Sequence, residues 1–119
     1  MSVDPRSTRG QRGKLEQDFS VELEPDGDGW RIGLMGDIDV AADAAVRAAL
    51  GHALARTGSH VVIDLRATTF LDSTGINNLV LAHKAAQAAS VRLVVEPGPP
   101  AIMRTLRIAG IDWMLGLGD

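Results

Sequence analysis

The chain has 119 residues, of which 45% are hydrophobic, and a formal net charge of −3 at pH 7. This length suits one compact domain with a hydrophobic core, and an aromatic content of 3% leaves few side chains for stacking on nucleic-acid bases. Because cysteine is absent, disulfides, thiolate nucleophiles and zinc–thiolate sites are excluded.

The first 14 residues form a basic segment that we expect to be disordered, since they show no hydrophobic periodicity. Its charged residues are Asp4, Arg6, Arg9, Arg12 and Lys14. The segment therefore carries a charge of +3 and the domain, expected over residues 15–119, carries −6. An acidic domain does not attract phosphate backbones, so no nucleic-acid partner is expected. The chain also lacks a signal peptide and an apolar run of roughly 20 residues, so we expect a cytoplasmic protein with no membrane contact.

A β-hairpin is expected to open the domain. Phe19, Val21 and Leu23 alternate with polar residues, as in a half-buried strand. Residues 25–29 (PDGDG) are typical of a turn, and residues 30–35 form a second apolar run.

The remainder of the chain alternates between helical and strand patterns. We expect a helix over 41–57 that ends at Gly58, a strand over 61–65 and a loop over 67–72. A second helix begins at Ser73 and has Ile76, Leu79, Val80 and His83 on one face. A strand over 91–95, a helix over 101–109 and a short strand or turn over 111–117 complete the chain. Strands that alternate with helices favour right-handed crossovers and a mainly parallel sheet. We therefore predict an α/β domain with a mixed sheet of four to five strands and three to four helices.

Few residues suggest catalysis or ligand binding. His52, His60 and His83 share no metal-binding spacing, and no glycine-rich phosphate loop is present, so neither a metal nor a cofactor is expected. The run Asp37-Ile38-Asp39 resembles the nucleophile loop of haloacid-dehalogenase-type phosphotransferases, although Ala41 stands where that loop has Thr or Val. This alternative predicts magnesium-dependent turnover of a phosphate ester with Asp37 as the nucleophile.

Ser73 lies where the predicted loop becomes a helix, and this position suits two roles. As an N-cap, its hydroxyl would accept a hydrogen bond from an early backbone N–H group of the helix. As a phosphorylation site, it would place a phosphate at a helix N-terminus, where unpaired N–H groups and a partial positive charge favour anions.

Three separated motifs resemble the STAS domains of anti-sigma-factor antagonists. The first is the turn Gly36-Asp37-Ile38-Asp39, and the second is a strand over 61–65 followed by 70–76 (FLDSTGI). The third is 100–106 (PAIMRTL) with Gly110-Ile111 after it. The resemblance spans about residues 19–117 and implies a STAS-like fold with no catalysis of its own.

The resemblance also implies a regulatory cycle that controls transcription in stress responses. The unphosphorylated antagonist binds an anti-sigma factor with serine kinase activity and frees a sigma factor. Phosphorylation of Ser73, or of the adjacent Thr74, separates the two proteins, and a serine phosphatase restores the first state. The residues expected to contact the partner are Asp39, Asp72, Thr74, Gly75 and Asn77. Simpler roles remain open: N-capping for Asp39, loop-to-backbone hydrogen bonding for Asp72, and plain solvent exposure for Asn77 and Asn78. A STAS scaffold or accessory subunit, in which Ser73 is only a helix cap, is the alternative function.

Overall fold

The structure of the protein is a computed structural model that describes residues 19–55 and 59–118. The predictions for the basic segment, for the start of the domain at residue 15 and for the helix end at Gly58 lie outside the described residues.

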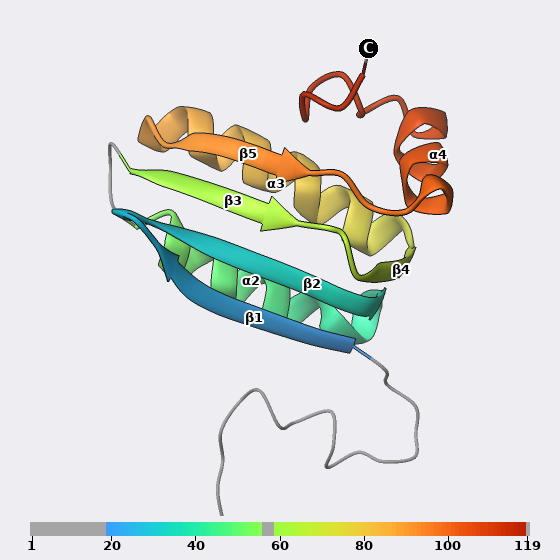
Figure 1. The fold of residues 1–119 in the computed structure, drawn as a ribbon, viewed down its shortest axis with the longest axis horizontal. Coiled ribbons are helices and arrows are strands. Elements are labelled where there is room, and N and C mark those ends of the chain that lie inside the picture. Colours follow the sequence, from blue (N-terminus) through green and yellow to red (C-terminus); the bar gives the residue numbers. More distant parts are fainter. Residues whose placement is uncertain (1–18, 56–58, 119) are drawn as a thin grey trace, which may run out of the picture.

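The described residues form an α/β domain around one mixed sheet (Figure 1). In chain order the elements are β1 (Phe19–Asp26), β2 (Gly29–Ile38), the 3-10 turn η2 (Val40–Ala42), α2 (Asp43–Ala53), β3 (His60–Asp64), β4 (Thr68–Leu71), α3 (Ser73–Ala89), β5 (Arg92–Glu96) and α4 (Pro100–Ile108). β1 is antiparallel to β2, and the other strand pairs are parallel. The order across the sheet is β1-β2-β3-β5, and β4 pairs with β2. The predicted fold class is confirmed.

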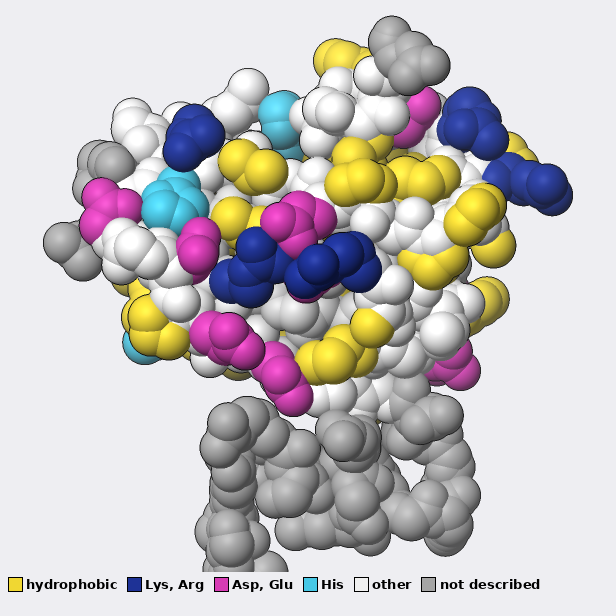
Figure 2. Space-filling view, viewed as in Figure 1, with side chains coloured by type: hydrophobic (Ala, Val, Ile, Leu, Met, Phe, Trp, Pro, Cys, Tyr) yellow, Lys and Arg dark blue, Asp and Glu magenta, His cyan; other side chains and the backbone are white. Residues whose placement is uncertain are grey.

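The helices α2 and α3 lie on one face of the sheet, while the other face is open over most of its area (Figures 1 and 2). Because side chains alternate along a strand, every second residue of β2 and β3 points into the helical layer. Ile32, Leu34, Val61 and Ile63 fill this layer and are at most 1% exposed. Leu79 of α3 closes over them from the helical side.

Two predicted elements, the loop over 67–72 and the helix over 41–57, differ from the structure for local reasons. The loop expected over 67–72 contains β4, which pairs with the end of β2 and is held there by the buried Thr68 hydroxyl donating to the Leu34 carbonyl. The helix expected over 41–57 begins at Asp43, because 40–42 forms the tighter turn η2, and it ends at Ala53, because residues 54–55 form a turn. The segment 111–117 is a turn, one of the two forms expected for it. Within the described ranges, no helix has the length and hydrophobicity needed to cross a membrane.

Candidate functional site

Ser73 lies at the carboxyl ends of β2 and β4, where α3 begins. Ile38 pairs with Leu71 across these strands, and the Asp72 N–H donates to the Ile38 carbonyl at 3.4 Å. The turn that follows Ile38 carries Asp39, and η2 next to it contacts α3. The structure thus brings together the motifs at residues 36–39 and 70–76, which are at least 30 residues apart in the chain. In open α/β sheets this edge is where binding sites form.

Asp72, not Ser73, is the N-cap of α3. Asp72 has an extended backbone, and its Oδ1 accepts a hydrogen bond from the Gly75 N–H at 3.0 Å. Ser73 is the first helical residue, so the predicted capping role for its hydroxyl is wrong, and loop-to-backbone bonding by Asp72 is confirmed. Asp and Ser are about equally good N-caps, so the sequence could not show which of the two residues caps α3. The Ser73 side chain is exposed and makes no hydrogen bond with any described residue.

Gly75 allows the first turn of α3 to rest directly on the end of β2. A Cβ atom at this position would lie 2.6 Å from the Ile38 carbonyl oxygen and 2.9 Å from Leu71 Cδ2. Real Cβ atoms do not approach other atoms this closely, so only glycine fits without movement of the helix. Gly75 is buried and allows the start of α3 to pack closely on the end of β2.

The two aspartates of the upstream turn make local hydrogen bonds. Asp39 Oδ1 accepts from the Ala41 N–H at 3.0 Å, which confirms its capping role, here for η2. Asp37 Oδ1 accepts from the Thr69 hydroxyl at 2.7 Å. Across residues 19–55 and 59–118 there is no group of three or more His, Cys, Asp or Glu side chains that could hold a metal ion. The alternative in which Asp37 is a phosphotransferase nucleophile stays a prediction.

Two exposed apolar residues belong to the elements next to the start of α3: Val40 lies in η2, which contacts α3, and Phe70 lies in β4, three residues before Ser73. We define the Ser73 surface as Asp39, Val40, Phe70, Ser73 and Asn77. Val40 is 69% exposed and Phe70 is 49% exposed, values that are high for residues of this type. Asn77 is exposed and Thr74 is half-buried. This end of the molecule therefore combines carboxylates with apolar contact area.

Asn78 is buried, contrary to the expected solvent exposure. Its side chain is 2% exposed, and its Nδ2 donates to Asp43 Oδ1 at 2.8 Å. This bond and a second one from Arg47 hold the pKa of Asp43 below its ordinary value. The inward face of α3 is therefore rotated from the predicted stripe. The residues that α3 buries are Gly75, Asn78, Leu79, Ala82 and Ala86.

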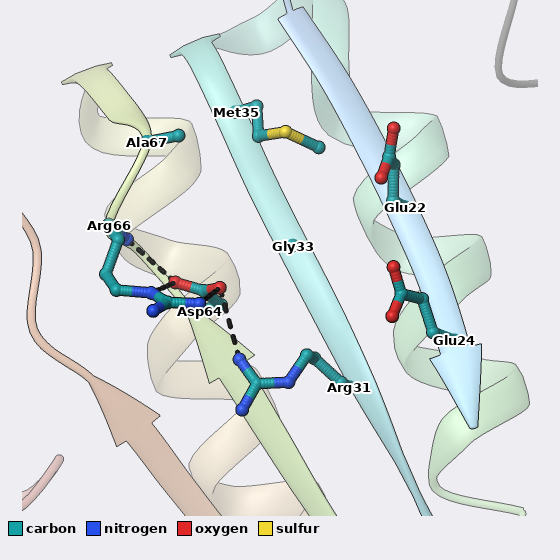
Figure 3. A pocket seen from close by; sticks show the side chains of 8 residues that line it. All are labelled: Glu22, Glu24, Arg31, Gly33, Met35, Asp64, Arg66 and Ala67. Atoms are coloured by element: carbon teal, nitrogen blue, oxygen red, sulfur yellow. Dashed lines mark hydrogen bonds and ion pairs between the residues drawn. The ribbon is translucent and has the colours of Figure 1, made fainter. Parts of the chain in front are cut away.

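A charged depression of about 380 Å³ lies on the open face of the sheet, next to Gly33 of β2 (Figure 3). Arg31 donates to both carboxylate oxygens of Glu96, at 2.8 and 2.9 Å, and to Asp64 at 3.1 Å. The bond with Glu96 raises the pKa of Arg31 and lowers that of Glu96. Hydrogen bonds from Arg66 lower the pKa of Asp64 to about 2.

These ion pairs tie β2, β3 and β5 together across the open face. Both arginines are paired with carboxylates of the same sheet, so the cluster is explained by the fold itself. The cluster could not be predicted from the sequence, because Arg31, Asp64 and Glu96 are far apart in the chain. The strand register brings Asp64 directly opposite Glu96.

Comparisons with known proteins match this fold. The family model described as "Mlab, STAS domain" covers residues 21–116. An anti-sigma factor antagonist from Mycobacterium paratuberculosis is 25% identical with a TM-score of 0.67, and 81% of each chain is covered. The anti-sigma factor antagonist SpoIIAA in its unphosphorylated form is 20% identical with a TM-score of 0.62, over 75% of this chain and 83% of that one. A structure of Mglu is 31% identical with a TM-score of 0.58, over 66% of this chain and 19% of that one.

Proposed function

The chain belongs to the STAS domain family, and we propose that it is an anti-sigma-factor antagonist whose partner binding is ended by phosphorylation of Ser73. The observation that carries the proposal is the position of Ser73, which is exposed as the first residue of α3 and lies beside the Asp39 turn. The similarity to two proteins described as anti-sigma factor antagonists supports the same role. The protein is proposed to act by binding, without catalysis of its own.

The proposed partner is an anti-sigma factor with serine kinase activity. In the transfer step the Ser73 Oγ atom attacks the γ-phosphorus of ATP bound to the kinase. A new Oγ–phosphorus bond forms as the bond to ADP breaks, and a base of the kinase takes the hydroxyl proton. Ser73 is favoured over Thr74 as the acceptor because its side chain is exposed, whereas Thr74 is half-buried. A serine phosphatase would hydrolyse the phosphoserine and restore the binding state.

The start of α3 suits a phosphate without loss of the fold. Asp72 already satisfies the N–H groups of Gly75 and Ile76, and those of Ser73 and Thr74 have no acceptor among the described residues. Free N–H groups and the positive end of a 17-residue helix stabilise negative charge. The phosphate would add about −1.5 to −2 charges beside Asp72 and the Asp39 turn. Partner release is therefore expected to follow from the changed charge of the Ser73 surface rather than from unfolding.

A scaffold or accessory role is the second candidate. It is favoured by the similarity to Mglu, whose structure is not described as that of an antagonist and of which this chain spans about a fifth. In such a role Ser73 would be only an exposed residue of the first helical turn, and its charge would not affect assembly.

Binding measurements with charge-mimicking variants separate the two candidates. Calorimetric titration of the anti-sigma factors of the source organism should show that Ser73→Ala binds like the wild type. Ser73→Asp should bind at least about tenfold more weakly, which corresponds to about 1.4 kcal/mol. Ser90→Asp is the matched control, because it adds the same charge at the opposite end of α3, where Ser90 has a left-handed backbone that Asp tolerates. Equal binding of all four proteins would favour the scaffold role.

A further inference from the structure

Asn77 is the exposed residue of α3 that follows Ser73 by about one helical turn. Residues four apart in a helix share a face, and their Cβ atoms lie about 5–6 Å apart. Side chains of an α-helix also lean towards its N-terminus, so the Asn77 amide is directed to the turn that begins at Ser73. Because Ser73 is itself exposed, a group attached to its hydroxyl would extend over the same part of the surface.

The side-chain amide of Asn77 is free among the described residues, with none of which it makes a hydrogen bond. Its neighbour Asn78 differs, because that side chain is 2% exposed and its Nδ2 donates to Asp43. Asparagine is also a weaker helix former than alanine, so Asn77 does not serve the stability of α3. Two N–H donors of the Asn77 amide are therefore available to another group.

The elements around Ser73 offer a phosphate neutral donors but no cation. Neither η2 nor the first two turns of α3 contains a lysine or arginine, and Lys84 is the first such residue of α3. The charged side chains next to Ser73 are instead the carboxylates of Asp39 and Asp72. A phosphate adds strong acceptor oxygens, which in proteins are commonly bound by arginine. In these elements the donors left for it are backbone N–H groups of the first helical turn and the Asn77 amide.

We propose that the side-chain amide of Asn77 donates a hydrogen bond to the phosphate on Ser73 and holds it against the first turn of α3. This role rests on the proposed phosphorylation of Ser73 and makes Asn77 a positioning residue for the phosphate. A hydrogen bond to a charged acceptor is about twice as strong as a neutral one, so the phosphate is a better acceptor for the amide than water is. A phosphate held in this way covers Asn77, which is the residue that α3 adds to the Ser73 surface beyond Ser73 itself.

Phosphoserine introduced at position 73 during translation gives the phosphorylated full chain without a kinase. In ¹⁵N NMR spectra the side-chain amide protons of Asn77 should shift downfield relative to the unphosphorylated chain, as protons do when they are donated to a charged acceptor. The side-chain signals of Asn78 should stay in place, because that amide is held by Asp43. Since no kinase takes part, a negative result removes the role of Asn77 and leaves the proposed switch at Ser73 untouched, and the failure of every kinase to modify Ser73 would not change this result.

Urea unfolding measures what the amide contributes. For each variant the midpoint is compared with and without the phosphate, so that the higher helix propensity of alanine cancels. The midpoint change caused by the phosphate should be about 0.3–0.5 M less favourable in Asn77→Ala than in the wild type. Asn77→Gln keeps the amide and should behave like the wild type. Gln87→Ala is the matched control, because it removes an exposed amide from the other end of α3.

Three results would overturn the role of Asn77. The first is that its side-chain amide signals do not move on phosphorylation. The second is that the phosphate changes the urea midpoint equally in the wild type and in Asn77→Ala, and the third is that Gln87→Ala shows the same loss as Asn77→Ala. A phosphoserine chain that is unfolded, as judged by circular dichroism, would overturn it as well, because the phosphate is proposed to rest on an intact α3.

Discussion

Replacing Gly75 with alanine tests whether the start of α3 is held against the end of β2. The added Cβ would lie 2.6 Å from the Ile38 carbonyl oxygen and 2.9 Å from Leu71 Cδ2. The leucine methyl can move by rotation of its side chain, but the carbonyl belongs to β2, which is paired with β4 at this residue. The helix start must therefore shift, and with it Asp72 and Ser73.

The expected loss of stability follows from two opposing effects. Overpacking of a close contact costs about 1–3 kcal/mol. Alanine is a better helix former than glycine, and this difference raises the free energy of unfolding by at most about 1 kcal/mol. Taking about 2 kcal/mol, the middle of the overpacking range, we expect Gly75→Ala to lower the free energy of unfolding by about 1–2 kcal/mol.

Urea unfolding followed by circular dichroism measures this change. With a slope near 2 kcal/mol per molar urea, the midpoint should fall by about 0.5–1 M at unchanged slope. Gly51→Ala is the matched control, because the same substitution in open space within α2 should raise stability by about 0.5–1 kcal/mol. A Gly75→Ala midpoint equal to or above that of the wild type would refute the close contact between α3 and β2.

Two further predictions concern single carboxylates. Asp72→Ala removes the acceptor of the Gly75 N–H and should lower stability by about 1 kcal/mol in the same urea assay, whereas Asp72→Asn, an equally good cap, should retain most of it. Equal losses in both variants would contradict the capping role. The pKa of Asp64 is lowered to about 2, so its ionised form stabilises the fold above about pH 4, and this contribution disappears as the pH falls towards 2. Asp64→Asn should therefore be about 1–2 kcal/mol less stable than the wild type at neutral pH. This value is smaller than the full pKa shift of Asp64 would give, because Arg66 is largely exposed and its charge is screened by solvent. The loss of stability should vanish near pH 2, and a loss that persists there would argue against the ion pairs as its cause.

The elements that could be predicted from the sequence are those with a clear hydrophobic period. The alternation of Phe19, Val21 and Leu23 predicts β1, and the apolar run around Val62 predicts β3. The four-residue strand β4 could not be recognised, because too few residues are present to show a period and its place depends on pairing with β2. The resemblance at residues 36–39 and 70–76 grouped Asp39 with the residues around Ser73, and in the structure the turn that follows Asp39 contacts α3.

Features that depend on tertiary contacts could not be predicted from the sequence. The choice of Asp72 over Ser73 as the cap depends on the angle at which the chain leaves β4. The burial of Asn78 could not be predicted from the sequence, because a side-chain amide is usually exposed unless folding brings a partner such as Asp43 to it. The cross-strand ion pairs of Arg31 required the register of three strands.

Ser73 is proposed as the phosphorylated residue, and the direct test is the intact mass of the protein after incubation with anti-sigma kinases and ATP. We expect a gain of one phosphate, about 80 Da, in the wild type and in Thr74→Ala, and no gain in Ser73→Ala. A phosphate that remains in Ser73→Ala, or no gain with any kinase that binds the protein, would contradict it.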